Sequence, residues 1–502
     1  MGLRIKVKKK ARKILPGLNR KDRLCQKIIE YGVLGVLIFS PLPAASVEEW
    51  AILVIQLAVI IMMIAYFLMK EKPQNNILLS HSLKWPRYLF VALFILMIIQ
   101  LIPFPKAAIK ILSSNAYSFQ NLYQTDFSKI SFMSLSLIPS QSIQAGLELL
   151  TYFFLGFLIV KTVTRRHQVM RIFTVLIVMG ILEAFYGLFE LYNKNPRILF
   201  YEKTYYLDSV TGTFVNRNHL SGYLEMVIPL CIGLVIARMD LGSLAGLRWR
   251  EKLLRLSEKG VGTNILLSLG VVIMSVAVIF SKSRSGVSLL ILAFILFFGL
   301  SMLFIRGTIH QKSWIRKFLT IVFLFILFIA LYVGIDANLE RFALDKVLHE
   351  DRPVVWANTF TIFSDYPLFG TGLGTFASIY PAYEDSKEYF RYSHAHNDYL
   401  EYLAELGVFG FVFLAGGILI VLINSFLVWK ERRHPWVKGL ALGGIIAVIC
   451  MLVHSVTDFN LQIPANMVLF SVVLSLTITV AFYKRKEGNN TLVKMNTRGR
   501  GR

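Results

Sequence analysis

The sequence is poor in charged residues, and poorest in acidic ones. Asp, Glu, Lys and Arg make up 17% of the 502 residues, and Lys and Arg (54) outnumber Asp and Glu (30). A water-soluble chain of this length is expected to form two or more domains with charged surfaces. The low charge content excludes such surfaces, and the mean hydropathy of +0.59 indicates a chain that lies largely in lipid.

Cysteine is scarce as well. The three residues, Cys25, Cys231 and Cys450, are widely spaced and lie near or within apolar segments. This pattern excludes a disulfide framework and a cysteine-based metal site.

Hydrophobic residues, by contrast, make up 55% of the chain and gather in long blocks. A helix needs roughly 17–25 apolar residues to cross the hydrocarbon core of a bilayer. The blocks predict about twelve membrane-spanning helices, at 28–45, 50–69, 88–104, 145–160, 172–191, 219–237, 264–280, 285–305, 318–335, 400–428, 439–456 and 465–483. The first block also resembles a signal peptide, but its basic start is too long for one, so we expect a retained helix. The expected fold class is an all-α polytopic membrane protein.

The positive charges predict the orientation. About three-quarters of the 54 Lys and Arg residues fall in the two tails and in alternate loops, which the positive-inside rule assigns to the cytoplasm. Both termini are then cytoplasmic, and the net charge of +24 lies beside anionic headgroups. We expect no nucleic-acid partner. The predicted regions are a basic tail (1–27), spans 1–6 (28–263), a central region (264–430), spans 11 and 12 (431–483) and a second basic tail (484–502).

Three outer segments are long enough to carry function: 105–144, 192–218 and the loop 336–399 between spans nine and ten. A loop as long as the last is unusual without a function. Within it, Trp356, Phe360 and Phe363 recur at helical spacing, which predicts a short amphipathic helix on the outer membrane surface.

The glycine run from Gly370 to Gly374 follows this helix. A nucleotide-binding loop would need a preceding buried strand and a following helix, and neither is expected here. We therefore expect these glycines to permit a tight turn and a close approach to neighbouring backbone.

His394 and His396 lie at the end of the same loop. Glu384, Asp385, Glu388 and Asp398 are near in sequence, but no third strong ligand stands at a recognisable metal-binding spacing, so we expect no metal. The histidines could be ordinary solvated loop residues. However, His396 and Asn397 precede a predicted helix, whose N-terminus favours a neutral, proton-accepting imidazole and binds phosphate oxygens.

Three arginines are predicted on the same outer side: Arg217, Arg284 and Arg352. Each could simply contact lipid headgroups or hold a structural anion. An arginine fork also suits phosphate, because it can donate two parallel hydrogen bonds. If the three converge, they predict a site for a lipid diphosphate.

These motifs together resemble the O-antigen ligase family. His396-Asn397, nine residues and then Gly407-Val408-Phe409-Gly410 is similar to the family's His-Asn-x9-Gly-x-x-Gly signature. The run from Arg352 to Phe376 resembles the family's large periplasmic loop, and Ser283-Arg284-Ser285-Gly286 resembles its arginine turn. The resemblance is specific over roughly 265–430.

The resemblance implies a metal-independent, inverting glycosyltransferase of the bacterial inner membrane that needs no cofactor. Its donor would be a polyprenyl-diphosphate-linked glycan. If the family's residue roles apply to the matching positions here, Arg284 and Arg352 would bind the donor diphosphate. Arg217 is assigned to the same role because it is predicted on the same outer side. His396 would be the general base. Supporting roles would fall to His394, Asn397, Gly407 and Gly410.

The acceptor stays open at this point. A ligase joins the glycan to lipid A core, a polymerase joins it to another lipid-linked glycan, and a related branch modifies protein Ser or Thr. A solute transporter, for example of bicarbonate, is the alternative from another class. A purely structural assembly partner is a third. Transport would require charges near the bilayer midplane, and Glu183 is the candidate, although packing against a polar neighbour would also explain it.

Overall fold

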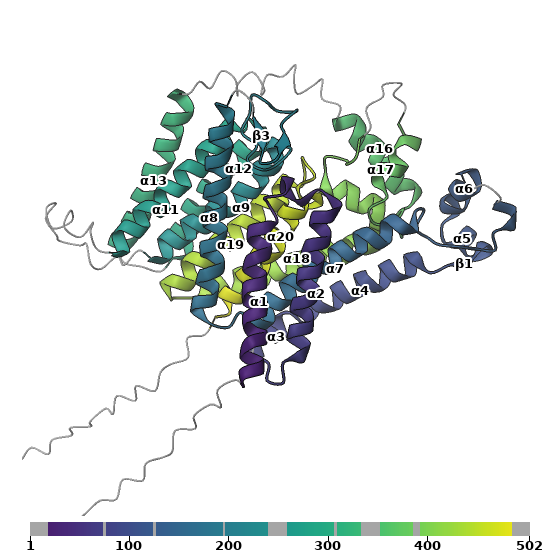
Figure 1. Cartoon of the computed structure of the whole chain (residues 1–502), viewed down its shortest axis with the longest axis horizontal. Coiled ribbons are helices and arrows are strands. Elements are labelled where there is room, and N and C mark those ends of the chain that lie inside the picture. The colour runs from purple at the N-terminus through teal and green to yellow at the C-terminus, as the bar shows by residue number, and fades with distance from the viewer. Residues whose placement is uncertain are drawn as a thin grey trace, which may run out of the picture.

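The computed structural model describes residues 19–73, 77–123, 127–193, 196–238, 259–305, 309–332, 352–384 and 392–483, and these ranges are mainly helical (Figure 1). The long helices are α1 (Arg20–Phe39), α2 (Glu49–Leu68), α4 (Lys84–Leu101), α7 (Pro139–Thr162), α8 (Arg166–Leu191), α9 (Arg217–Arg238), α11 (Lys259–Phe280), α12 (Arg284–Phe304), α13 (Ile309–Tyr332), α18 (Asp398–Glu431), α19 (Pro435–His454) and α20 (Pro464–Ala481).

Short elements connect them. They are the helices α3 (Ile77–Ser82), α5 (Lys106–Leu112), α6 (Ser114–Tyr123), α16 (Arg352–Asp365) and α17 (Phe376–Ile379), and the single turns η1 (Ala44–Ser46), η2 (Phe127–Lys129), η4 (Tyr380–Ala382) and η5 (Asn460–Gln462). Two antiparallel ribbons pair β1 (Phe104–Pro105) with β2 (Phe132–Met133), and β3 (Arg197–Ile198) with β4 (Tyr201–Glu202).

Each predicted span coincides with a long helix, and the all-α polytopic class is confirmed. Within the described ranges, 10 helices are long and apolar enough to cross a membrane. α1 and α13, at the positions of the first and ninth predicted spans, are not among those 10. Several helices begin before the predicted span, as α7 does at Pro139 and not at 145. The first turns of these helices are polar, so hydropathy does not mark them. The predicted spans therefore start later than the helices do.

Three helices form the interior of the bundle. The most apolar windows of α9, α19 and α20 are 94%, 83% and 89% buried, against 50% or less in the other spans. Glycines let two of these helices touch: a Cβ atom on Gly439 would lie 2.4 Å from the carbonyl oxygen of Gly233, and one on Gly443 would lie 2.5 Å from that of Pro229. Small residues of this kind allow backbones to approach closely in membranes.

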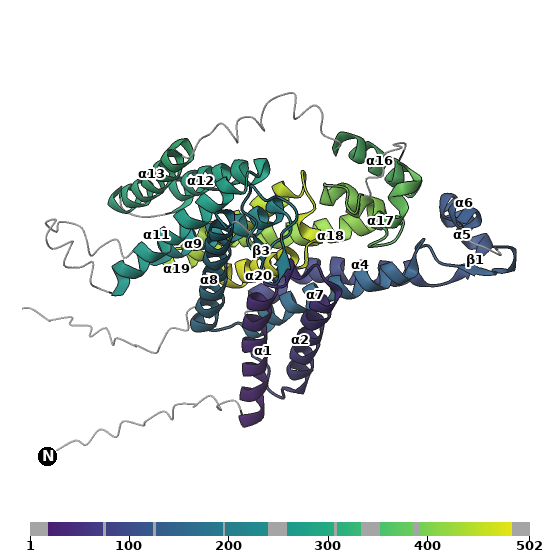
Figure 2. The same ribbon diagram turned by 45° about the horizontal axis from the view of Figure 1, so that its top comes forward.

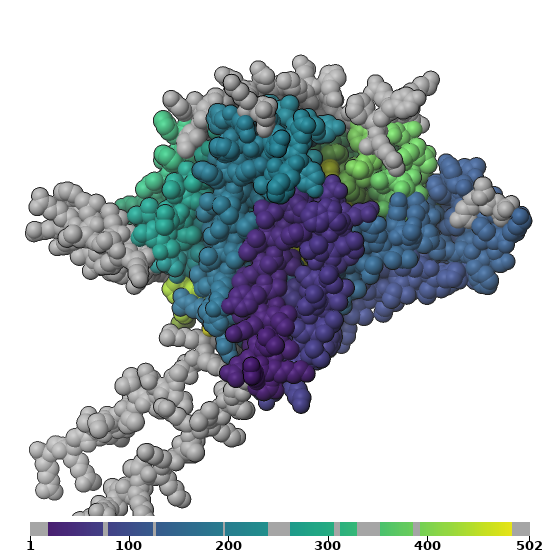
Figure 3. All heavy atoms as spheres, in the orientation of Figure 1, coloured from purple at the N-terminus to yellow at the C-terminus, as the bar shows by residue number. Residues whose placement is uncertain are grey.

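The peripheral helices expose apolar side chains. α2, for example, has Leu53, Leu57, Ile60 and Phe67 at its surface, each more than half exposed. α1 and α2 lie side by side on one face of the molecule (Figure 3). A helix with an exposed apolar face is expected where lipid takes the place of water.

α18 is interrupted at Gly407, where φ is 63° and ψ is −176°. Backbone groups of residues 367–372 form hydrogen bonds with the residues on both sides of this interruption. The amide of Thr371 donates to the carbonyl of Ala404 at 3.0 Å, and the amide of Val408 donates to the carbonyl of Pro367 at 2.8 Å. The loop therefore satisfies backbone groups that the broken helix leaves unpaired.

This contact requires glycine on both sides. A Cβ atom on Gly370 would lie 2.3 Å from the carbonyl oxygen of Glu405, and one on Gly407 would lie 2.3 Å from that of Leu368. The close backbone approach predicted for the glycine run is confirmed. Gly410 lies one turn further on, where its Cβ atom would meet a methyl carbon of Leu96 in α4 at 3.0 Å, so this glycine lets α18 pack closely on α4.

A second apolar core joins α5 and α6 to α16 and α17, with Ile109, Ala116, Leu135, Val355 and Phe376 among its buried members. α4 and α7 run toward the arm that α5 and α6 form, which projects from the body (Figure 2).

The helix predicted around Trp356, Phe360 and Phe363 is α16. Val355, Thr359 and Ile362 are buried, whereas Phe360 is exposed. The β-branched face therefore packs on the protein, which leaves Phe360 free to contact the membrane surface expected beside this helix. The flanking residues 333–351 and 385–391, including Asp385 and Glu388, lie outside the described residues.

Candidate functional site

A single carboxylate, Asp458, connects distant parts of the chain. It lies in the loop 455–463 between α19 and α20 and is 1% exposed. Its Oδ2 atom accepts a hydrogen bond from Nδ2 of Asn218 at 2.7 Å, and its Oδ1 atom lies 3.3 Å from Nδ1 of His396. A guanidinium nitrogen of Arg352 lies 3.9 Å from Oδ2. The starts of α9 and α16 and the segment before α18 therefore meet at one side chain.

The surroundings keep Asp458 ionised. Burial alone would raise its pKa, but the hydrogen bond from His396 and the nearby His219 and Arg352 hold the pKa well below its usual range. An ionised carboxylate can only accept hydrogen bonds, so Nδ1 of His396 carries the proton in this contact. Nε2 of a neutral His396 is then the atom that can take up a proton.

The ring of Phe459 packs against three imidazoles. It stacks on His394 with 4.4 Å between ring centroids, and it meets His396 edge-on at 4.8 Å and His219 at 4.6 Å. His219 is also 3.9 Å from Asp458 through Nε2. The aromatic ring and the carboxylate together fix the positions of these side chains.

The backbone before α18 is built around Asn397. Its side-chain oxygen accepts from the amides of Tyr399 at 3.0 Å and Leu400 at 3.1 Å, so Asn397 is the N-cap of α18. His396, directly before the cap, has a φ of 50°. This left-handed conformation is uncommon for histidine and is found where the surroundings hold a residue in place. The indole of Trp356 donates to the carbonyl of His396 at 3.3 Å.

His394 pairs with Glu401. Its Nδ1 atom lies 2.8 Å from Oε1 of Glu401, whose other oxygen accepts from the amide of Ala395 at 2.7 Å. Burial would lower the pKa of His394, but the Glu401 carboxylate outweighs burial and raises it. The two histidines of the predicted pair therefore have separate partners.

Arg352 directly contacts the Asp458 cluster, which consists of Asp458, Phe459, His219, His394 and His396. Besides approaching Asp458, it donates from Nη1 to the carbonyl of Thr457 at 2.7 Å. Arg284, the first residue of α12, is half-buried, and the hydroxyl of its neighbour Ser285 lies 2.9 Å from that of Thr457. Both arginines thus border the loop 455–463.

Arg217, the third arginine, begins α9 and precedes Asn218, which donates to Asp458. Its guanidinium lies 4.8 Å from the ring of Tyr206 and donates to the hydroxyl of Ser209 at 3.2 Å. The segments that carry the three arginines converge on one loop, although Arg217 turns toward the 206–209 segment.

Two buried carboxylates lie deeper in the bundle. Glu183, the sequence candidate for a midplane charge, accepts from the amide and the hydroxyl of Thr213, each at 2.9 Å, so a polar neighbour accounts for its burial. Glu225 in α9 lies 2.9 Å from Nδ1 of His454 at the end of α19, and both are buried. In the described part of the chain, no group of three or more His, Cys, Asp or Glu side chains is placed to hold a metal ion.

Sequence reasoning did not single out Asp458 or Phe459. Asp458 carries a usable signal, since it is the one carboxylate in the loop 455–463 of a chain poor in acidic residues. His219 ends the polar string Asn216-Arg217-Asn218-His219, but nothing in the sequence connects it to a residue more than 200 positions away.

The fold and this cluster define a polytopic membrane protein with a buried, histidine-containing polar site at one end of its helices. Residues 269–415 match the family model for O-antigen ligase, which confirms the resemblance over that region. The matched region includes Arg284, Arg352, His396 and Gly407 and ends before Asp458. It supports a membrane enzyme of the O-antigen ligase or polymerase type, which transfers glycosyl groups. No curated protein matches the chain.

Proposed function

We propose that the protein transfers a glycan from a polyprenyl-diphosphate carrier to an acceptor hydroxyl on the periplasmic face of the bacterial inner membrane. The observation that carries the proposal is the contact between His396 and Asp458 beside Arg352. A buried anion, an imidazole and a guanidinium at one point are suited to proton removal next to a phosphate leaving group.

His396 is the general base in this proposal. The acceptor oxygen attacks the anomeric carbon, the bond from that carbon to the diphosphate oxygen breaks, and the acceptor proton passes to Nε2 of His396. Asp458 stabilises the imidazolium that forms and keeps the ring in one orientation, as carboxylates do for histidine bases in general. A positioned base contributes about 10²–10⁴-fold to such a step.

The arginines bind the donor. A sugar diphosphate leaves with growing negative charge, which guanidinium groups stabilise through paired hydrogen bonds. Arg352 is best placed for this role, with Arg284 on the adjoining helix and Arg217 at the edge of the site. The bond from Arg352 to the Thr457 carbonyl keeps its guanidinium at the site without a donor present.

The orientation that fits this chemistry places both termini in the cytoplasm and the loop 336–399 in the periplasm, as the positive charges favour. The acceptor we propose is lipid A core, with another lipid-linked glycan as the polymerase alternative. The arginines that we propose to bind the donor would have the same role with either acceptor.

Transport is the second candidate, and one observation favours it. The buried pair of Glu225 and His454 lies within the helices, where transporters keep proton-carrying groups. Glu225→Gln distinguishes the two functions: a transporter would lose proton-coupled uptake, whereas a transferase would keep its glycan products if the variant folds.

The deciding experiment complements a deletion strain with the wild type, His396→Ala or Asn424→Ala, a control far from the site. We expect His396→Ala to be present at normal level without producing long glycans. Lipid-linked polymer that accumulates would identify a ligase, and single lipid-linked repeats would identify a polymerase. Normal glycans with His396→Ala would refute the proposed mechanism.

A further inference from the structure

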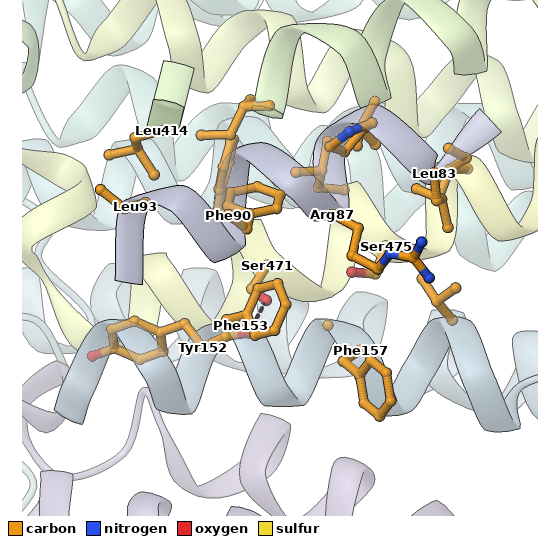
Figure 4. Close-up of a pocket in the computed structure, with 18 of the residues that line it drawn as sticks. Leu83, Arg87, Phe90, Leu93, Tyr152, Phe153, Phe157, Leu414, Ser471 and Ser475 are labelled. Carbon is orange, nitrogen blue, oxygen red and sulfur yellow. Dashed lines mark hydrogen bonds between the residues drawn. The ribbon is translucent and has the colours of Figure 1, made fainter. Parts of the chain in front are cut away.

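A narrow apolar cavity of about 270 Å³ lies between α4, α7, α18 and α20 (Figure 4). It is separate from the Asp458 cluster. Gln100, near the end of α4, donates to the carbonyl of Glu405 on the side of the functional site. The cavity extends past the other end of α4, to Leu79 in α3. The cavity therefore reaches the ends of α4 and α7 that are remote from His396, although along α20 it extends as far as Met467.

The length of the cavity matches one leaflet. Along α7 its lining extends from Leu149 to Lys161, which corresponds to about 18 Å at 1.5 Å per residue. Half of the hydrocarbon core is about 15 Å thick. Phe90 and Phe153 in the lining are only half-buried, so the cavity is a groove that is accessible from the side.

The two ends of the groove differ in chemistry. Leu93 and Tyr152 lie at one end, and Arg87 extends along the other, near Ser475 (Figure 4). Lys161 belongs to the same charged end, because it follows Phe157 by one turn of α7. Gly156 lets α7 pack closely on α20 beside the groove, since a Cβ atom there would lie 2.6 Å from the hydroxyl of Ser475.

We propose that this groove binds an anionic phospholipid from the leaflet opposite the functional site. One acyl chain lies between α4 and α7, and the phosphate meets Arg87 and Lys161. Charge complementarity at one end and the length of a single leaflet carry this assignment. The bound acyl chain would pack against all four helices that line the groove, α4, α7, α18 and α20, and so stabilise their contacts.

The test uses the purified full-length protein and native mass spectrometry with phosphatidylglycerol and phosphatidylcholine as probes. We expect the wild type to retain phosphatidylglycerol preferentially. R87Q/K161Q should reduce that preference roughly 5- to 30-fold, because each basic residue near a membrane surface contributes on the order of 1 kcal/mol. K84Q/R433Q removes the same charge outside the groove and should leave the preference unchanged.

A second variant tests the acyl chain. Ser475→Phe places a ring in the groove and should reduce retention of both lipids, whereas Ser288→Phe adds the same bulk at an exposed position of α12 and should not. The proposal is overturned if R87Q/K161Q keeps the wild-type preference, or if K84Q/R433Q loses as much as R87Q/K161Q. Lipid preference is measured without turnover, so the result is independent of glycan transfer.

Discussion

Nδ1 of His396 and Oδ1 of Asp458 lie 3.3 Å apart although 62 residues separate them in the chain. One residue precedes α18 and the other follows α19, so the contact exists only when these two helices and the loop 455–463 are in place. The carboxylate fixes which ring nitrogen carries the proton, and this turns a loop histidine into a candidate base.

Asp458→Asn tests the contact directly. The amide can still accept a hydrogen bond but lacks the charge that stabilises an imidazolium, so we expect the transfer rate to fall about 10²–10⁴-fold. Transfer to acceptor by purified protein, together with donor binding, measures the effect. Asp365→Asn, which changes a carboxylate at the far end of α16 that accepts from the hydroxyl of Tyr383 at 2.8 Å, is the control. Wild-type transfer by Asp458→Asn would remove Asp458 from the mechanism.

Arg352→Gln should weaken donor use. Loss of a guanidinium at a diphosphate removes charge stabilisation in both the bound donor and the transition state, and we expect kcat/KM for the donor to fall about 10²–10³-fold. Arg433→Gln, at the opposite end of the bundle, should have no effect. An unchanged kcat/KM for Arg352→Gln would mean that this side chain only holds the loop 455–463 in place.

Asn397→Ala removes the N-cap of α18. Such a loss costs about 1 kcal/mol, and we expect a lower Tm in thermal unfolding of the detergent-solubilised protein. Asn397→Asp keeps an oxygen acceptor and should restore most of the stability. If both variants lower the Tm equally, the amide group acts through something other than the cap.

Gly407→Ala should prevent normal packing. The new methyl group would meet the Leu368 carbonyl in a left-handed backbone conformation, so the cost exceeds the roughly 1 kcal/mol of an ordinary helical substitution. Gly299→Ala in α12 is the matched control, because nothing lies within 4 Å of its added methyl group. The yield of folded protein in gel filtration compares them. Equal yields would contradict the required backbone contact.

Asp458 and His394 predict that the folded protein loses stability at low pH and at high pH, respectively. The pKa of Asp458 is lowered on folding, so its contribution is complete above the unfolded pKa of about 4 and is lost as the pH falls. The pKa of His394 is raised, so its contribution is complete below the unfolded pKa of about 6.5 and is lost as the pH rises through the folded value.

Melting curves across pH check this prediction. We expect the Tm of the wild type to decline on the alkaline side. His394→Gln should lower the Tm below about pH 6.5 and remove part of the alkaline decline, while the loss caused by Asp458 at low pH remains. A His394→Gln curve parallel to the wild type on the alkaline side would show that the contact with Glu401 does not contribute.

The sequence predicts the helices well because crossing a bilayer demands length and apolarity, and both can be read locally. It also predicts that the glycine run approaches neighbouring backbone, since few other roles suit Gly370 and Gly374 together. It does not predict Asp458 as the partner of His396, because that contact depends on how α19 returns beside α18. The sequence does not predict which face of α16 packs on the protein for a similar reason: the helix has an aromatic and a β-branched face, and only tertiary packing decides between them.

The interior position of α9, α19 and α20 has a consequence for biosynthesis. α9 is made early, yet much of its buried surface is covered by α19 and α20, which follow roughly two hundred residues later. Until residues 435–481 enter the membrane, α9 must rest against lipid or a chaperone, and Asn218 has no carboxylate to bind. An unfinished chain therefore has every predicted arginine but lacks Asp458, so catalytic competence would arise only at the last step of assembly.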